Sequence, residues 1–393
     1  MKVKKIYKAY KFRMYPSDDQ RNLLNQFLGC SRFIYNYYLD YKDKKYKEEK
    51  INVKLSDLKK DLVNLQVDYP WLKEMDSCIL RTSLDNLDDA YNRYFKGQTG
   101  FPRFKSKNNH DTYKTICNRS TYKGKIYESI KIDIENKILT LPKIKEIKVR
   151  GYRNLKEFKG KILSATVEKV ANKYYVSLCV EKEILIPDFY PSRAIGIDIG
   201  IKNIVITSDG EKYDNLIKRQ ERLEKRLRGL KTALSRKEKG SNNYKKQIIK
   251  VQRIYEKLRN IRKYTIHSIT KKIVTENDII AVETLQTKKM IEEGTRKLSF
   301  GISNSSFNEI IRQLTYKSNW SNKRLIKIDK YYPSSQLCCH CKEKNNEVKD
   351  LSVRSFVCKN CGCLNDRDIN ASINILDRGM EIFIKEGIIE QYI

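Results

Sequence analysis

The chain has 393 residues, which is long enough for two to four domains that each bury a core. Apolar and aromatic residues make up 40% of it, which excludes a wholly disordered chain, and 81 Lys and Arg against 48 Asp and Glu leave a formal net charge of +33. This charge predicts a polyanionic partner rather than a face that only confers solubility, because neutralising phosphates releases condensed counterions.

The sequence contains no apolar run of about 18 residues and no signal peptide, so we expect a soluble, cytoplasmic protein with no membrane partner. Its ten cysteines are too few for a disulfide scaffold in a chain of this length. Four stand alone in apolar segments, where reduced core cysteines are expected: Cys30, Cys78, Cys117 and Cys179. The other six lie between Cys338 and Cys363, a clustering that points to metal.

The N-terminal region is predicted to be one strand followed by a helical domain. Residues 2–14 alternate, with Tyr10 and Phe12 on one face. Ser17 and Gln20 form a capping-box pattern, and helical spacing of apolar residues continues to about residue 120. Aromatic residues at this spacing favour a helix core, with base stacking as the alternative for Tyr35, Tyr37, Tyr38 and Tyr41.

Strand periodicity dominates from about residue 123 to residue 180. Ile130 and Ile132 alternate with charged residues, and the apolar runs 162–170 and 174–180 flank a turn at Asn172. This succession of strands predicts a small barrel or sandwich, which the N-terminal strand could join. The segment 187–191 begins and ends with proline and is predicted to be a linker.

Strands alternate with helices from residue 193 onward, which predicts an α/β domain. Strands are expected at 194–201, 204–207, 278–283 and 325–329. Leucines at heptad spacing predict a helical hairpin over 214–275. Residues 214–240 carry ten Lys or Arg against four Asp or Glu. This excess of positive charge indicates either a solvent-exposed face or a surface that binds the phosphate backbone of a nucleic acid.

Asp198 stands in an apolar strand where its neighbours on the same face are glycines. Side chains alternate along a strand, so isoleucines fill one face while Asp198 shares the other with Gly196 and Gly200. Glycine inside a strand marks the close approach of a ligand or of another backbone. A hydrated metal ion with a phosphodiester would need that room, and we expect the glycines to provide it.

Two further acids have similarly small neighbours. Glu283 ends a core strand beside Ala281, and Asp368 lies in the first turn of the last helix, where Asp366 is predicted to be the N-cap. Three carboxylates within about 4 Å would repel by about 4 kcal/mol per pair at an effective dielectric constant near 20, so such a cluster needs cations. Two Mg²⁺ ions suit hard oxygen ligands and support phosphodiester hydrolysis.

Two Cys-x-x-Cys pairs separated by sixteen residues have the spacing of a four-cysteine zinc ribbon: Cys338, Cys341, Cys358 and Cys361. A ribbon of this size buries too little apolar area to fold unaided, so one structural Zn²⁺ supplies the missing free energy. Three more residues lie close enough to compete for the metal, which leaves the ligand register open: Cys339, His340 and Cys363.

In chain order, these motifs resemble the TnpB family of compact transposon-encoded RNA-guided nucleases, which are related to the type V CRISPR effectors. The resemblance runs nearly end to end. It rests on Tyr10-Lys-Phe-Arg-Met-Tyr-Pro16, Gly29-Cys-Ser-Arg-Phe-Ile-Tyr-Asn36, Phe101-Pro-Arg-Phe-Lys105, Gly196-Ile-Asp-Ile-Gly-Ile-Lys202, Val282-Glu283, Tyr332-Pro-Ser-Ser-Gln336 and Asp366-Arg-Asp-Ile-Asn-Ala371.

The resemblance implies a multidomain protein with an RNase H-like nuclease domain of the RuvC type and an inserted zinc ribbon, together with a wedge-type β-barrel and a helical recognition domain. The implied boundaries are 1–15 and 121–190 for the barrel, 16–120 for the helical domain, 191–336 and 364–393 for the nuclease domain, and 337–363 for the ribbon. It also implies Asp198, Glu283 and Asp368 as the catalytic acids.

The implied partners are a guide RNA, which pairs with the target, and double-stranded DNA, of which the protein reads a short flanking motif. RNA guidance rests on the resemblance alone. Candidate nucleic-acid contacts are the basic residues within the shared motifs: Arg13, Arg32, Arg103, Lys105, Lys202 and Arg367. The chain departs from the family where Lys342 replaces the glycine that usually follows the second cysteine, and we expect a distorted first knuckle.

The sequence therefore favours a metal-dependent, RNA-guided DNA endonuclease, acting as a monomer or homodimer. A nuclease-silent, RNA-guided repressor is the first alternative, but it would be favoured by the loss of an acid, and all three are present. A transposase that performs strand transfer with the same acids is the second. A CRISPR effector is a close variant of the main hypothesis.

Overall fold

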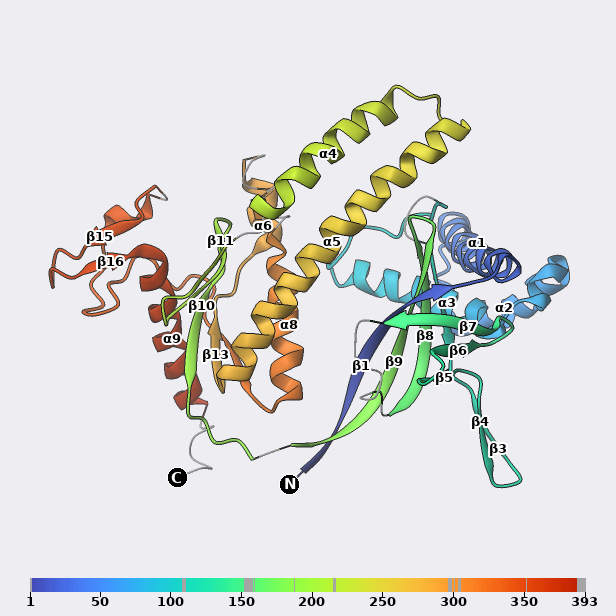
Figure 1. The fold of residues 1–393 in the computed structure, drawn as a ribbon, viewed down its shortest axis with the longest axis horizontal. Helices are drawn as coiled ribbons and strands as arrows, with labels where there is room; N and C mark the ends of the chain where they lie inside the picture. Colours follow the sequence, from blue (N-terminus) through green and yellow to red (C-terminus); the bar gives the residue numbers. More distant parts are fainter. Residues whose placement is uncertain are drawn as a thin grey trace. The chain divides into compact units, whose positions relative to one another are not determined.

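The computed structural model describes residues 2–107, 111–151, 158, 160–186, 188–214, 217–295, 299, 301–302, 305–350 and 352–386. They fall into two compact units, shown in Figure 1. The N-terminal unit spans Lys4–Ile184, and the C-terminal unit spans Leu185–Ile393 together with Met1–Val3. Within the described ranges, no helix is both long and apolar enough to span a bilayer.

The N-terminal unit contains a seven-stranded sheet in the order β2-β8-β9-β1-β7-β6-β5. Its strands are β1 (Lys2–Tyr15), β2 (Thr112–Ile116), β5 (Lys131–Asp133), β6 (Ile138–Leu141), β7 (Lys145–Gly151), β8 (Lys161–Val170) and β9 (Lys173–Ile186). The predicted turn at Asn172 joins β8 to β9. The order runs from edge strand β2 to edge strand β5, and no pairing closes these edges into a barrel in the part of the chain described.

Helices of the same unit share one hydrophobic core with this sheet. They are α1 (Asp18–Glu49), α2 (Leu55–Asp68), the 3-10 helix η1 (Pro70–Glu74) and α3 (Ser77–Phe95). The capping box at Ser17 and Gln20 is present, and Tyr10 and Phe12 of β1 are buried as predicted. Tyr35 and Tyr38 are buried in the core, and Tyr37 and Tyr41 pack against it. These four tyrosines therefore belong to the helix core, as the sequence favoured, and not to a base-stacking surface.

The helical stretch ends earlier than the sequence indicated. Helix α3 ends at Phe95, and β2 and then the strand β3 (Arg119–Tyr122) lie in the segment expected to be helical up to about residue 120. The alternation in β2 covers only Tyr113 and Thr115, which are buried on either side of an exposed Lys114. A period of two over so few residues is easily masked, although β-branched and aromatic residues favour a strand there.

The C-terminal unit is built on a five-stranded sheet in the order β12-β11-β10-β13-β14. Its strands are β10 (Ala194–Asp198), β11 (Asn203–Thr207), β12 (Lys212–Asp214), β13 (Ile279–Val282) and β14 (Arg324–Lys327). Strands β10, β13 and β14 run parallel, whereas β11 and β12 are added at one edge through antiparallel pairings. The predicted α/β architecture is confirmed in this unit, and the strand expected at 194–201 is shorter and ends at Asp198.

Helices cover both faces of this sheet (Figure 1). On one face, Ile195, Ile197, Ile280 and Val282 pack against α5 (Asn242–Glu276) and α8 (Phe307–Trp320). On the other face lies α9 (Arg367–Lys385). The predicted helical hairpin consists of α4 (Ile217–Ser235) and α5. The leucines of α4 at the predicted spacing pack against Val251, Ile254 and Leu258 of α5.

Helix α9 approaches the sheet so closely that only glycine and alanine fit between them. A Cβ atom at Gly196 would lie 2.0 Å from the backbone oxygen of Ser372, and one at Gly379 would lie 2.4 Å from the Cβ atom of Ala281. The glycine in β10 therefore makes room for another backbone. The expectation that Gly196 clears space for a hydrated metal ion is therefore wrong. Gly196 instead allows the backbone of α9 to pack against the strand.

We expect Gly196→Ala to destabilise the C-terminal unit by about 2–4 kcal/mol, because α9 must move away from β10. The measurement is urea unfolding followed by Trp320 fluorescence in a Trp71→Phe background. Gly229→Ala on α4 is the matched control. Its Cβ atom meets no described atom within 4 Å, so it should be neutral or stabilise by up to about 1 kcal/mol. Equal unfolding curves for the two variants would contradict the packing argument.

Candidate active site and metal centre

Two of the three predicted acids lie side by side at the carboxyl ends of parallel strands. The register of β10 and β13 pairs Ile197 with Val282, so the next residues, Asp198 and Glu283, are neighbours. Alternation places both carboxylates on the face that Gly196 presents to α9. Open α/β sheets bind their ligands at this edge, outside the carboxyl ends of the strands.

The third acid reaches the same place because α9 begins there. Asp366 caps the helix by accepting hydrogen bonds from the backbone N–H groups of Asp368 and Ile369, both at 3.1 Å, and its other oxygen accepts one from Lys212 Nζ at 2.6 Å. The N-cap role predicted for Asp366 is confirmed. Asp368, two positions further on, is left partly exposed and faces the other two acids.

Electrostatics show that Asp198 feels the charges of the other two acids. Burial raises the pKa of Asp198 from its ordinary 3.8 to about 7, and repulsion from Glu283 and then Asp368 adds to the shift. Burial also raises the pKa of Glu283. Ionising this cluster is therefore unfavourable without cations.

Two arginines border the cluster. Arg367 is 8% exposed, donates a hydrogen bond from Nη1 to the backbone oxygen of Asp350 at 3.1 Å and slightly lowers the pKa of Asp198 by its charge. Arg354 precedes β15 (Ser355–Val357), and its Nη1 atom lies 3.6 Å from the Asp368 carboxylate. Arg354 could not be predicted from the sequence, because a single exposed arginine between two cysteine pairs belongs to no recognisable motif.

The donor set of this cluster suits hard divalent cations. Asp198, Glu283 and Asp368 offer only carboxylate oxygens, and all three side chains are partly exposed. The three acids are therefore candidate ligands for Mg²⁺, although among the described residues the four cysteines are the group whose ligand atoms converge within 4.8 Å.

The cysteine pairs form a second candidate metal site. The Sγ atoms of Cys338, Cys341, Cys358 and Cys361 all lie within 4.8 Å of one another, and two of the contacts between them measure 3.6 Å. A tetrahedral Zn–S site with bonds of about 2.3 Å has sulfur atoms about 3.8 Å apart, so the geometry fits zinc. In the described part of the chain this group is the cluster with metal-ligand geometry, and its members are the four cysteines of the two Cys-x-x-Cys pairs.

The competing residues have other roles or lie outside the cluster. Cys339 Sγ is 3.3 Å from the side-chain oxygen of Asn365, and its backbone N–H donates to Asn370 Oδ1 at 2.7 Å. Neither His340 nor Cys363 belongs to the four-sulfur group. Backbone N–H groups, first that of Cys361, lower the pKa of Cys358 to about 6, which favours the thiolate that zinc requires.

The first knuckle is not distorted, contrary to expectation. Lys342 has φ +59° and donates its backbone N–H to Cys338 O at 2.9 Å, just as Gly362 has φ +73° and donates to Cys358 O at 2.8 Å. The left-handed conformation costs a lysine roughly 1 kcal/mol. Its ammonium group, however, bonds Asn374 Oδ1 at 2.9 Å and pairs with Asp377, both on α9.

Buried asparagines of α9 complete the attachment of the cysteine segment. Asn370 and Asn374, 1% and 0% exposed, both donate to the backbone oxygen of Leu337 at 2.7 Å, and Asn374 also donates to Ser334 O at 2.8 Å. The backbone N–H of Arg367 donates to Arg354 O at 2.9 Å. The helix that carries Asp368 is thus hydrogen-bonded along its first half to the four-cysteine segment.

The predicted nucleic-acid contacts divide into exposed and internal side chains. Arg103 and Lys202 are exposed and remain candidates, and Arg13 is partly exposed with its guanidinium 4.7 Å from the Tyr15 ring. Arg32 pairs with Asp111 at 2.7 Å. Lys105 lies 3.9 Å from the Tyr35 ring centre, and burial lowers its pKa. Arg367 is buried. The last three hold the fold together.

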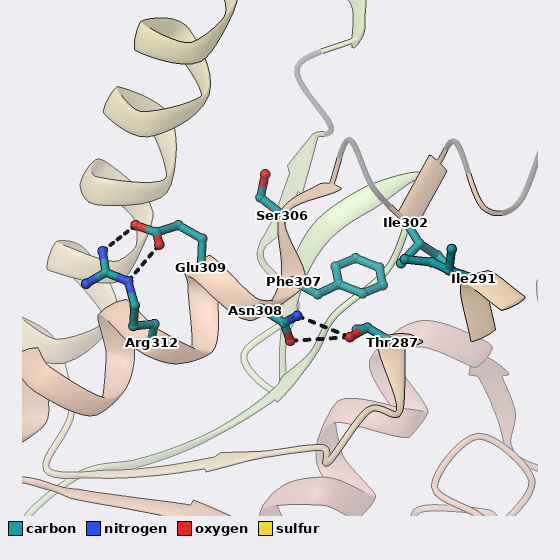
Figure 2. Close-up of a pocket in the computed structure, with 8 residues that line it drawn as sticks. All are labelled: Thr287, Ile291, Ile302, Ser306, Phe307, Asn308, Glu309 and Arg312. Atoms are coloured by element: carbon teal, nitrogen blue, oxygen red, sulfur yellow. Dashed lines mark hydrogen bonds and ion pairs between the residues drawn. The ribbon is translucent and has the colours of Figure 1, made fainter. Parts of the chain in front are cut away.

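A pocket of about 380 Å³ lies between α6 (Thr287–Glu293) and α8, away from the acids (Figure 2). Thr287 and Asn308 hydrogen-bond each other across it at 3.2 Å, and Glu309 pairs with Arg312 at 2.7 Å. None of the three acids lines this pocket, so it is not the site described above.

Family models match three parts of the chain. One described as "Probable transposase" matches residues 177–293, one described as "Cas12f1-like, TNB domain" matches 307–375, and one described as "Helix-turn-helix domain" matches 1–50. In the structure, the last region holds β1 and the single long helix α1 instead of two short helices.

Whole-length relatives are found as well. A Streptomyces pristinaespiralis protein described as "Putative RNA-guided DNA endonuclease" is 30% identical over 96% of this chain and 90% of its own length. InsQ of Escherichia coli (strain K12), with the same description, is 28% identical over 95% and 93%. The structure of a Cas12f1-sgRNA-target DNA complex matches with a TM-score of 0.57 at 14% identity, over 94% of this chain and 98% of that one, and thus shares the fold.

We expect the chain to bind one zinc ion through the four clustered thiolates. Cys358→Ser should therefore lose the bound zinc and lower the melting temperature, whereas Cys339→Ser should retain both, since Cys339 lies outside the cluster. Elemental analysis of the purified proteins and thermal unfolding measure this. Loss of zinc from the Cys339→Ser protein would show that the ligand register is wrong.

The raised pKa of Asp198 predicts a pH-dependent fold in the presence of a chelator. Between pH 3.8, the ordinary pKa of an aspartate, and about pH 7, the Asp198 carboxyl keeps its proton in the folded protein but has lost it in the unfolded chain. The stability of the fold therefore falls as the pH rises through that window. We expect the parent to lose on the order of 1–3 kcal/mol between pH 5 and pH 8. Asp198→Asn should lose less, with the remainder due to Glu283. Surface Asp209→Asn is the control and should follow the parent.

Proposed function

Because the chain belongs to the TnpB family, we propose that it is an RNA-guided DNA endonuclease that hydrolyses phosphodiester bonds at Asp198, Glu283 and Asp368. The observation that carries the proposal is the register of β10 and β13, which sets two acids side by side at the strand ends where α9 delivers the third. The relatives' description as RNA-guided DNA endonucleases supports the activity, and the net charge of +33 supports a nucleic-acid substrate.

We assign the C-terminal unit to a RuvC-type nuclease domain, 191–336 and 364–393, with a zinc ribbon at 337–363 inserted before α9. The five-stranded sheet, in which β11 alone runs opposite to the other four strands, supports this assignment. In the N-terminal unit, 1–15 and 121–190 would form the wedge-type domain and 16–120 the recognition domain. The shared hydrophobic core means that these two segments fold together.

The three acids would hold two Mg²⁺ ions, which supply charge neutralisation for the attacking and leaving oxygens of the phosphodiester. The chain's own part is to fix the carboxylates. Strand pairing orients Asp198 and Glu283, the Asp366 cap fixes the first turn of α9 and thereby Asp368, and the small Gly196 sets how far α9 stands from the sheet. Arg354, beside Asp368, is placed to meet the negative charge of a phosphate.

In this proposal the N-terminal unit and the exposed basic residues hold the guide RNA, and base pairing selects the target DNA beside a short flanking motif. The Cas12f1 complex whose fold this chain shares contains a guide RNA and target DNA, which supports these partners. The alternative of a transposase finds support in the description of the model that matches residues 177–293. Strand transfer without added RNA would distinguish it from guided cleavage.

We expect Asp198→Ala to lower guided cleavage of a plasmid target by more than about 100-fold, because it removes a metal ligand. The assay uses protein purified with its co-expressed RNA, and the RNA is sequenced first to define the guide. Asp366→Asn is the matched control. Asparagine caps a helix as well as aspartate does, so cleavage should stay within about tenfold of the parent.

Both variants should bind RNA as the parent does, since neither acid touches RNA in the proposal. Cleavage by Asp198→Ala at the parental rate would show that the site is misassigned. Binding of guided DNA by the parent protein without any cleavage in Mg²⁺ would support the repressor alternative instead.

A further inference from the structure

A short hairpin of the N-terminal unit forms a two-stranded sheet of its own, separate from the seven-stranded sheet. It consists of β3 and β4 (Lys125–Glu128), which pair only with each other among the described strands, and all of β3 and most of β4 are exposed. Figure 1 shows it extending away from the rest of that unit. A two-stranded hairpin is at best marginally stable in water on its own. A binding partner that covers its side chains would therefore stabilise it.

The two faces of the hairpin differ in chemistry. Residues directly opposite in an antiparallel pair share a face. The pairs Ser120–Tyr127 and Tyr122–Lys125 make one face, and the pairs Arg119–Glu128 and Thr121–Ile126 make the other. The first, which we call the tyrosine face, carries two aromatic rings and an ammonium group. On the second, Arg119 and Glu128 neutralise each other in an ion pair.

The rings of the tyrosine face are open to solvent. Tyr122 is 63% exposed and Tyr127 is 47% exposed. They sit diagonally across the two strands, a spacing of about 7–8 Å between backbones that suits two planar groups bound next to each other. Exposed aromatic rings next to each other on one face offer two flat surfaces on which planar groups could stack.

The turn adds positive charge at a conformational cost. Lys123 has φ +48° and Gly124 φ +72°, which is the pattern of a two-residue turn that fits the strand twist but suits asparagine and glycine better than lysine. The Lys123 ammonium group lies 5.5 Å from the Tyr122 ring centre. Neither Lys123 nor Lys125 has an acidic partner within the described ranges. The face is thus aromatic and cationic, without compensating anions.

We propose that the tyrosine face binds an unpaired segment of the guide RNA, with bases stacked on Tyr122 and Tyr127 and phosphates near Lys123 and Lys125. Every base has a π face, whereas bases inside a duplex are already stacked and their faces are out of reach, so this chemistry selects single strands. Both rings carry a hydroxyl that can bond a ribose 2′-OH, which favours RNA over DNA. The choice of the guide as the source rests on the proposed function.

The test is a titration of the full chain with fluorescein-labelled oligouridine RNA of about 20 nucleotides, at several salt concentrations. Tyr122→Ala/Tyr127→Ala should weaken binding by about tenfold or more with an unchanged slope of log affinity against log salt, because stacking releases no counterions. Lys123→Gln/Lys125→Gln should make that slope shallower by about 1.4, since each phosphate contact to a single strand contributes about 0.7.

The matched control is Thr121→Ala/Ile126→Ala, which truncates two strand-favouring side chains on the opposite face of the same hairpin and should bind within twofold of the parent. Tyr122→Phe/Tyr127→Phe should keep most of the affinity but narrow the preference for oligouridine over oligodeoxyuridine. Equal losses in the alanine pair and the control, or no loss in either, would overturn the proposal. So would equal affinity of the parent for the two oligonucleotides.

This outcome is separable from that of the proposed function. The Asp198→Asn protein should titrate like the parent, because the acids lie in the other unit. A parent that binds oligouridine as expected but fails to cut guided DNA would refute the nuclease and leave the hairpin site standing. A parent that cuts DNA while the alanine pair binds RNA normally would refute the hairpin site alone.

Discussion

The close contact between α9 and the central sheet is the constraint on which the candidate active site depends. Gly196 lets the helix backbone come within van der Waals distance of β10, and Gly379 does the same against Ala281 of β13. Two contact points along one helix fix both its distance and its direction. The start of α9 is thereby held at the carboxyl ends of β10 and β13, so a packing requirement within the apolar layer determines where Asp368 stands relative to Asp198 and Glu283.

The four-cysteine segment acts on the same helix from its other side. Its backbone oxygens accept hydrogen bonds from the buried Asn370 and Asn374, and Lys342 reaches Asn374 and Asp377 from a left-handed backbone position. A zinc ion bound by the four thiolates would stabilise this segment and thereby also order the start of α9. A lysine in place of glycine costs backbone strain in the knuckle and returns contacts to the helix, which explains how the substitution is tolerated.

The sequence predicted where the acids lie in the fold better than it predicted which contacts hold them there. Alternation in β10 predicted that Asp198 faces away from the isoleucine core, and the cap assignment of Asp366 followed from its place before an amphipathic helix. The role of Gly196 was misjudged, because a sequence shows that a side chain is missing and not which neighbour takes its place. The short β2 was overlooked within a helical pattern, and Arg354 became visible only when the fold set it beside Asp368.

The grouping of acids that would bind a cation also lowers the stability of the cation-free fold. Burial, together with repulsion from Glu283 and Asp368, raises the pKa of Asp198 to about 7, so ionising this carboxyl without a cation costs the folded state stability. The surrounding structure offsets this with apolar packing of Ile195, Ile197 and Val282 on the far face of the sheet and with the capped, doubly anchored α9. The same strain gives a cation its affinity, because a bound ion stabilises the folded state by the repulsion that it removes. A cluster relaxed enough to be stable alone would bind a cation more weakly. The rigid scaffold would instead hold the acids in place for a cation that favours their ionised form.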